Sequence, residues 1–486
     1  MSGSAIRNKT VSSLLWMLFE RGGRAAVELI VQIVMARLLA PEQFGALAIM
    51  LVFVSLGNVI VQSGLNTALV QSSDADRDDC STVFWLSFCA SLVLYVIVFI
   101  CAPLVAAFYS MDSIIWPLRV LSLILIINSF NAVQIAIVQR ELMFQKIFVA
   151  TIVSIVVSGT LGIVCAALGF GLWALVTQQL LYQVVNCVVL VSQVRWLPRF
   201  VFNPKRAKVL FSFGWKLLAS GLLNQGYQSM ADLIVGRQFS PSTLGVLSQG
   251  KKYPTAIGSL LDGAIQPVML SAVAHVQNDA SYVRRLVRRA LKTSSYLIVP
   301  CMALFSVVAD PVVRLLLGEQ WLQTVPFLQM YCFINALLPI HTSNLQALNG
   351  MGRSDLFLKL ELIKKAYGIA LILVAAFVFK NVYILVGSYM IASVISTFVN
   401  AWPNRKVIGY SYIEQVKDIC PAFLLATVSA GVALPVGLFA LPDVVTVIFQ
   451  TVVMTVCYLG LSRLFKIEAL TYLISTVKEA VARKRG

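Results

Sequence analysis

Apolar runs of roughly 20 residues recur from one end of the chain to the other, and no other feature limits the possible folds so strongly. A transmembrane helix needs such a run, whereas a membrane β-barrel is built from shorter alternating segments. The chain of 486 residues is 59% hydrophobic and only 12% charged, unlike a soluble domain. We therefore predict an all-α polytopic membrane protein.

The apolar runs predict 14 spans, with no polar stretch long enough for a separate soluble domain. The nine cysteines form no C-x-x-C motif or Cys/His cluster, so we expect no disulfide, metal or cofactor site. The lone His341 is better interpreted as a structural residue than as a ligand. The predicted spans lie near residues 12–39, 44–69, 82–108, 115–138, 147–169, 171–194, 209–236, 242–274, 290–316, 324–348, 357–379, 381–402, 419–440 and 443–464.

The basic residues are distributed unevenly between the two sides of the predicted spans. With the N-terminus inside, 26 of the 38 Lys and Arg residues fall at inside connections and four at outside ones. This asymmetry follows the positive-inside rule and predicts that both termini are cytoplasmic. The net charge of +17 is then mostly topological and does not indicate nucleic-acid binding. The acidic inside loop 74–79 is the exception, but carboxylates count little in this rule.

The chain contains an internal repeat. Arg37, Pro41 and Gly45 recur as a set 200 residues later, and weaker matches follow at similar offsets. Each copy holds six spans, so the copies keep the same orientation and are related by an axis along the membrane normal. The predicted domains are an N-lobe at 1–194, a basic cytoplasmic linker at 195–208, a C-lobe at 209–402, two further spans within 403–464 and a basic cytoplasmic tail at 465–486.

The first span carries charges at membrane depth. Glu20, Arg24, Glu28 and Gln32 repeat every four residues and share one helix stripe, with Arg21 beside it. A charge at the bilayer centre costs roughly 2.5–3.5 kcal/mol, so such residues usually face a bundle interior or a watery cavity. Alternatively, the opposite charges of the stripe could neutralise each other at i,i+4 spacing and only hold helices together, although Arg21 would then have no opposite charge left to pair with.

Other spans repeat this pattern. The seventh span has five polar residues at strict i+4 spacing, and the second and eighth spans carry similar stripes. Together they predict a wet cavity with excess cations that favours an anionic ligand such as a pyrophosphate. A purely structural role in hydrogen bonding between helices would explain the amides well and the basic residues poorly. The stripe residues are Asn58, Gln62 and Asn66; Lys216, Ser220, Asn224, Gln228 and Asp232; and Lys251, Lys252, Asp262 and Gln266.

Several short motifs resemble one family over nearly the whole chain. Residues 37–45 (RLLAPEQFG) and 64–71 (GLNTALVQ) resemble the start of Wzx-type polysaccharide flippases, especially the WzxC-like branch. Residues 139–144, 318–321 and 352–355 are similar at matching places. This multidrug/oligosaccharidyl-lipid/polysaccharide exporter superfamily implies fourteen helices in two lobes. It also implies a bacterial inner-membrane protein that moves undecaprenyl-pyrophosphate-linked repeat units to the periplasmic leaflet for exopolysaccharide or lipopolysaccharide synthesis.

The resulting hypothesis is an alternating-access flippase and not an enzyme. Its expected partners are the lipid-linked oligosaccharide and membrane lipid, with the polysaccharide polymerase and export machinery as candidates. We assign the pyrophosphate to Arg21, Arg24, Lys216, Lys251 and Lys252, and the sugar hydroxyls to Asn58, Gln62, Asn66, Asn128, Asn224 and Gln228.

The main alternative is a cation-coupled small-molecule exporter of the same superfamily. In that case an ion-coupling site would lie among Glu20, Glu28, Asp232 and Asp262. A glycosyltransferase or polymerase would need a sizeable outside loop, and an ATP-driven pump would need a Walker-A motif; the chain has neither.

Overall fold

The structure is a computed structural model of the chain. It describes residues 23, 27–71, 76–141, 143–277, 279–439 and 441–475, apart from a few side chains within these ranges. Every regular element in these ranges is helical. The chain divides into two compact units, Met1–Ser248 and Gln249–Gly486. This division follows packing, and the lobe boundaries expected from the sequence stay a prediction.

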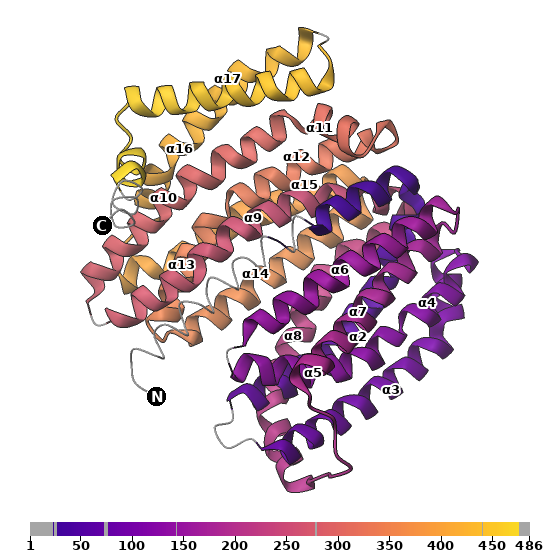
Figure 1. The fold of residues 1–486 in the computed structure, drawn as a ribbon. Helices are drawn as coiled ribbons and strands as arrows, with labels where there is room; N and C mark the ends of the chain where they lie inside the picture. Colours follow the sequence, from indigo (N-terminus) through magenta and orange to yellow (C-terminus); the bar gives the residue numbers. More distant parts are fainter. Residues whose placement is uncertain are drawn as a thin grey trace, which may run out of the picture. The chain divides into compact units, whose positions relative to one another are not determined.

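Unit 1 is a bundle of long helices in which α6 packs on α7, and α2 packs on α8, α5 and α3 (Figure 1). Its first described helix covers residues 27–38. The helices that follow are α2 (Pro41–Gln71), α3 (Arg77–Tyr109), η1 (Asp112–Ile114), α4 (Ile115–Leu121), α5 (Leu123–Arg140), α6 (Phe144–Ala167), α7 (Leu172–Val194) and α8 (Pro204–Gln238).

Unit 2 begins within α9 (Pro241–His275) and is also a helical bundle (Figure 1). In it α10 packs on α16, α12 and α13, and α14 packs on α15. The helices are α10 (Ala280–Val307), α11 (Ala309–Leu316), η2 (Glu319–Thr324), α12 (Val325–Ala336), α13 (Leu338–Gly350), α14 (Ser354–Val374), η3 (Ala375–Phe379), α15 (Val382–Val407), α16 (Tyr412–Ala433), η4 (Leu434–Phe439) and α17 (Asp443–Leu464).

Ten helical stretches in the described ranges are long and apolar enough to cross a membrane. The all-α membrane fold predicted from the apolar runs is thereby confirmed, whereas the count of 14 spans stays a prediction. Two predicted spans are interrupted by a short break: α4 gives way to α5 at Ser122, and α12 gives way to α13 at Leu337. The Ser122 hydroxyl donates to the Arg119 carbonyl oxygen (2.8 Å), which satisfies one backbone group beside the break.

Each unit has a buried hydrophobic cluster at the start of one helix, α3 in unit 1 and α10 in unit 2. In unit 1, Phe84 of α3 packs with Leu69 of α2, Val133 of α5 and Trp196, which follows α7. In unit 2, the cluster joins α9, α10, α13 and α16 around a fully buried tyrosine that follows α15. Its central members are Val273, Val287, Ile340, Tyr410 and Ile419.

Two glycines let α2 and the first turns of α9 meet backbone to backbone within unit 1. A Cβ atom added to Gly45 would lie 1.7 Å from the carbonyl oxygen of Pro241. A Cβ atom added to Gly245 would lie 1.9 Å from the carbonyl oxygen of Pro41. Both separations are far below van der Waals contact, so only glycine fits at either position.

Candidate functional site

The two longest helices, α8 and α9, carry the polar residues predicted on the seventh and eighth spans. Each has 35 residues, about 52 Å of helix, which exceeds the roughly 30 Å hydrocarbon core of a bilayer. Their length is enough to cross a membrane, so the polar residues of each helix are candidates for a functional site.

The polar stripe predicted on α8 lies beside its packed face. Gln225 donates to the hydroxyls of Ser55 on α2 (3.2 Å) and Ser229 (3.0 Å), which marks the side that packs on α2. Asn224 and Gln228 are exposed. Asp232, one turn further on, is half-buried. The middle of the stripe therefore presents two amides to the surroundings of unit 1. Lys216 lies on the same helix, and its side chain is outside the described part of the structure.

The amides predicted on the second and fourth spans contact each other. Asn128 of α5 donates from Nδ2 to the Oδ1 atom of Asn58 on α2 (2.9 Å), and Asn131 donates to the Oδ1 atom of Asn128 (3.2 Å). Asn128 is only 2% exposed, so this pair holds two helices together in the present conformation. Gln62 and Asn66 are half-buried further along α2.

α9 carries the predicted lysine pair and a buried carboxyl group. Lys251 and Lys252 are half-buried, eleven and ten residues before Asp262. Asp262 is 5% exposed and accepts a hydrogen bond from Nε2 of Gln266 (2.7 Å). The Thr342 side chain also interacts with this carboxyl group, although Oδ1 has no partner within 3.5 Å, and Asp262 makes no ion pair within the described ranges. A buried acid without a cationic partner is costly and marks a functional candidate in a membrane helix.

Part of the predicted first-span stripe lies outside the described residues, namely Glu20, Arg21 and Arg24. Of the remaining members, Glu28 is half-buried and Gln32 is 5% exposed in the helix over residues 27–38. Their assignment to a ligand stays a prediction. His341 fits the structural interpretation, since its ring nitrogens lie within hydrogen-bond distance of Ser393 (3.2 Å) and Asn400 (3.1 Å).

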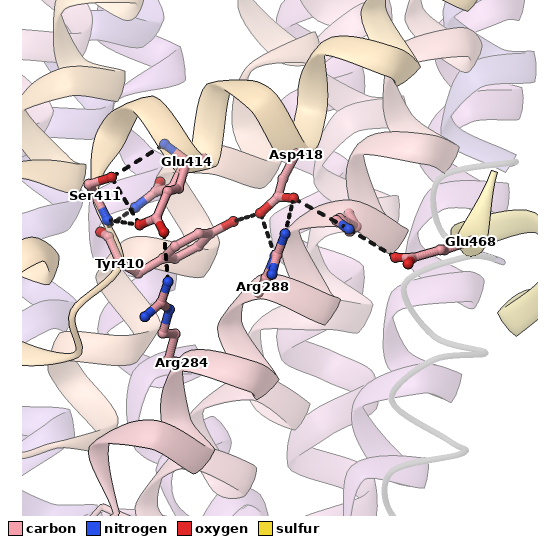
Figure 2. A network of polar contacts seen from close by, with 9 residues as sticks. Arg284, Arg288, Tyr410, Ser411, Glu414, Asp418 and Glu468 are labelled. Carbon is pink, nitrogen blue, oxygen red and sulfur yellow. Dashed lines mark hydrogen bonds and ion pairs between the residues drawn. The ribbon is translucent and has the colours of Figure 1, made fainter. Parts of the chain in front are cut away.

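Sequence reasoning missed an ion-pair network between α10 and α16, which Figure 2 shows. Arg288 donates from Nε and Nη2 to the two carboxylate oxygens of Asp418 at 2.7 and 2.8 Å. The Tyr410 hydroxyl donates to Asp418 as well (2.7 Å), and Lys292 lies 3.3 Å from it. One turn away, Arg284 pairs with Glu414 (2.7 Å). These residues follow i,i+4 spacing on both helices, so complementary charged faces were the available signal.

The same network also fixes the start of α16 and the segment after α17. Ser411 and Glu414 form a capping box that satisfies the first backbone N–H groups of α16. Lys292 bonds Glu468 at 2.9 Å, and the Lys292 ammonium beside it holds the pKa of the Glu468 carboxyl below its ordinary value. α10 therefore ties together α16 and the segment that follows α17.

A corresponding clamp joins α3 and α8 in unit 1. Arg206 donates from Nε (3.0 Å) and Nη2 (2.6 Å) to Asp79, whose side chain is 7% exposed. Asp79 is also the third helical residue of the capping box that Asp76 begins. Asp76 and Asp79, in the acidic loop that fits the positive-inside rule poorly, thus have a structural function. The connection before α8 is held too, because Trp85 donates to the Arg199 carbonyl oxygen (2.9 Å).

Ten apolar stretches in the described ranges, with charge clamps at the helix ends, define a multi-pass helical membrane protein. The chain belongs to the family described as polysaccharide biosynthesis protein, whose model matches residues 34–326. The resemblance to Wzx-type flippases stated from the sequence motifs is confirmed by this match and by the relatives that follow.

The similar curated proteins cover most of this chain and most of their own length. The succinoglycan biosynthesis transport protein ExoT of Rhizobium meliloti is 23% identical over 86% of this chain and 82% of its own. The teichuronic acid biosynthesis protein TuaB of Bacillus subtilis is 23% identical, with 83% and 84% covered. The lipopolysaccharide biosynthesis protein WzxC of Escherichia coli is 22% identical, with 89% covered in both chains.

Solved structures show the same fold. The lipid II flippase MurJ in an inward closed conformation aligns over 94% of this chain and 98% of its own, with a TM-score of 0.75 and 14% identity. An inward-facing multidrug resistance transporter of the MATE family aligns over 80% of this chain and 98% of its own, with a TM-score of 0.56 and 16% identity. The chain thus shares the fold of these two proteins.

Proposed function

We propose that this protein is a flippase that moves undecaprenyl-pyrophosphate-linked oligosaccharide repeat units across the bacterial inner membrane, for exopolysaccharide or lipopolysaccharide synthesis. The observation that carries the proposal is the match to three polysaccharide biosynthesis proteins, each of which this chain covers by four fifths or more. The polar helices α8 and α9 support it, because a polar headgroup can cross the bilayer only along polar groups.

The two-lobe repeat belongs to this proposal. Gly45 approaches Pro241 as Gly245 approaches Pro41, so equivalent positions of the two copies meet reciprocally. A reciprocal contact of this kind is what a twofold axis between two repeats produces. The buried clusters support the repeat as well, since each joins the third helix of its copy to the connection that follows the sixth. We infer two six-helix lobes that rock about a central cavity, followed by two more spans.

The cationic residues are proposed to hold the pyrophosphate. Lys216, Lys251 and Lys252, together with Arg21 and Arg24 of the first span, supply the charge that a pyrophosphate requires. The exposed amides of Asn224 and Gln228 are available to bond sugar hydroxyls.

The amides on α2 and α5 have a different part in the proposal. Asn58 and Asn128 bond each other in this conformation, so they reach a sugar only after that bond opens. Gln62 and Asn66 complete the polar face of α2.

The orientation and the energy source are proposed from charge. The asymmetry of basic residues puts both termini in the cytoplasm. Asp262 is the candidate for ion coupling, because it is buried without a cationic partner in the described ranges, and Glu28 and Asp232 are further candidates. A cation-coupled exporter of small molecules would use the same acids, so the substrate must be identified directly.

Deleting the gene in its own host and analysing lipid extracts by mass spectrometry tests the proposal. We expect a complete lipid-linked repeat unit to accumulate while the exported polysaccharide disappears, and plasmid-borne wild type to reverse both. The double variant Lys251→Ala/Lys252→Ala, compared at equal membrane abundance, should restore export poorly. Normal export in the deletion strain, or loss of export without an accumulating lipid-linked unit, would refute the proposed substrate.

A further inference from the structure

We propose that the basic end of α10 binds the phosphate of an anionic bilayer lipid. This inference requires only that the protein spans a membrane, and it does not depend on the flippase proposal. The site is a cavity of about 590 Å³ between the first turns of α10 and the segment that follows α17. Its lining includes Tyr282, Arg285, Arg289, Glu468 and Tyr472.

The charges of the lining leave two guanidinium groups without a carboxylate. Arg288 and Lys292, also in the lining, are already paired with Asp418. Glu468 is the one carboxylate among the described lining residues, and it is bonded to Lys292. Arg285 and Arg289 form no ion pair with a carboxylate in the part of the chain that the structure describes.

The two guanidinium groups are held side by side. Arg285 and Arg289 are four residues apart and share one face of α10, opposite the buried face of Val283 and Val287. Each lies over an aromatic ring: Arg285 is 5.2 Å from the ring centre of Tyr282, and Arg289 is 4.9 Å from that of Tyr472. A guanidinium stacked on a ring keeps its N–H edge for an anion, and it bonds phosphate oxygens in pairs.

The depth of the cavity favours a lipid over a free ion. α10 changes there from a charged helix to an apolar one, and the stretch Ala280–Val307 is apolar enough to enter a membrane. The apolar side chains of Leu297 and Ile474, which are close in sequence to the lining residues, are 46% and 47% exposed. Tyr282 and Tyr472 are of the residue type that is enriched in the headgroup layer. Basic pockets at this level bind the headgroups of anionic lipids. The positive-inside rule accounts for the positive charge at this end of α10, but it does not account for a cavity lined by these residues.

The test is lipid binding to the purified full-length protein in a neutral detergent. Native mass spectrometry is used to titrate dioleoylphosphatidylglycerol, with dioleoylphosphatidylcholine and inorganic phosphate in parallel arms. We expect wild type to bind phosphatidylglycerol well and phosphatidylcholine weakly. The variant Arg285→Gln/Arg289→Gln should bind phosphatidylglycerol roughly 30-fold more weakly. Arg285→Lys/Arg289→Lys should be intermediate, since charge remains and the paired hydrogen bonds are lost.

A matched control removes the same charge elsewhere. Arg405 and Lys406 are exposed at the end of α15 and do not line the cavity, so Arg405→Gln/Lys406→Gln should bind like wild type. Equal losses in the two double variants would mean diffuse attraction and overturn the site. Equal binding of both lipids would overturn its preference for an anion. Displacement of phosphatidylglycerol by millimolar inorganic phosphate would identify a free-anion site and overturn the lipid assignment.

Discussion

The ion-pair network between α10 and α16 predicts a large loss of stability when Asp418 is neutralised. The Asp418 side chain is 6% exposed and accepts two hydrogen bonds from Arg288 and one from Tyr410. Removing one partner of a buried ion pair costs about 3–5 kcal/mol. Because Arg288 is half exposed and water can solvate it in the variant, we expect Asp418→Asn to cost about 2–3 kcal/mol of unfolding free energy.

A second Arg–Asp pair on the same unit supplies the control. Arg353 bonds Asp355 through two nitrogens (3.2 and 3.3 Å), but both side chains are about half exposed. Exposed pairs contribute about 0–1 kcal/mol, so Asp355→Asn should change stability little. The two variants make the same chemical change, and they differ in burial.

Thermal unfolding in detergent, followed by labelling of newly exposed thiols, measures the difference. Cys332 of unit 2 is 1% exposed and becomes reactive only when its surroundings open. Asp418→Asn should melt several degrees below wild type, and Asp355→Asn close to it. Adding Arg288→Gln to Asp418→Asn should cost less than the sum of the single changes, because the unpaired cation is removed. Equal melting of Asp418→Asn and Asp355→Asn would refute the reasoning.

Three further predictions concern the glycine crossing, the topology and the first-span charges. Gly245→Ala should reduce the yield of monodisperse protein in size-exclusion chromatography, whereas Gly431→Ala, whose added Cβ meets nothing within 4 Å, should not; equal yields would contradict the crossing. Reporter fusions after Arg289 should report a cytoplasmic location, and fusions at Ser240 should report a periplasmic one. A reversed pattern would contradict the proposed orientation. Arg24→Ala should strongly reduce polysaccharide export at matched membrane abundance, and Arg24→Lys should be intermediate; rescue by neutralising one neighbouring carboxylate would mean that Arg24 only balances charge.

The helical membrane fold could be predicted because apolar length alone requires it. The i+4 stripe on the seventh span predicted a wet cavity. Two of its amides, Asn224 and Gln228, are exposed on α8, and that they line a cavity stays a prediction. α8 and α9 correspond to the seventh and eighth spans, which were predicted from apolar runs at 209–236 and 242–274.

The charge clamps could not be predicted in the same way. A basic residue near a helix end fits the positive-inside rule equally well with or without a partner, so sequence could not separate Arg288 from Arg285. The pairing of Asp79 with Arg206 joins residues 127 positions apart, and no local spacing encodes such a contact. In the region of α16 the local signals were the capping-box spacing of Ser411 and Glu414 and the i,i+4 spacing of Glu414 and Asp418.

Amide side chains in membrane helices are ambiguous for a related reason. An asparagine needs hydrogen-bond partners, and another amide supplies them as well as a sugar does. Asn58 and Asn128 form a hydrogen bond with each other, whereas Asn224 and Gln228 are exposed on α8. Only the arrangement of α2, α5 and α8 distinguishes the two cases.

Translocation by the purified protein in liposomes is the most direct test of the central proposal. The measurement follows a fluorescent lipid-linked oligosaccharide from the host as it becomes inaccessible to a membrane-impermeant quencher. We predict that wild type moves this lipid well above the rate in empty liposomes. Lys251→Ala/Lys252→Ala should move it much more slowly, while Arg405→Gln/Lys406→Gln should match wild type. Folded wild-type protein that moves the labelled lipid no faster than empty liposomes would contradict the account.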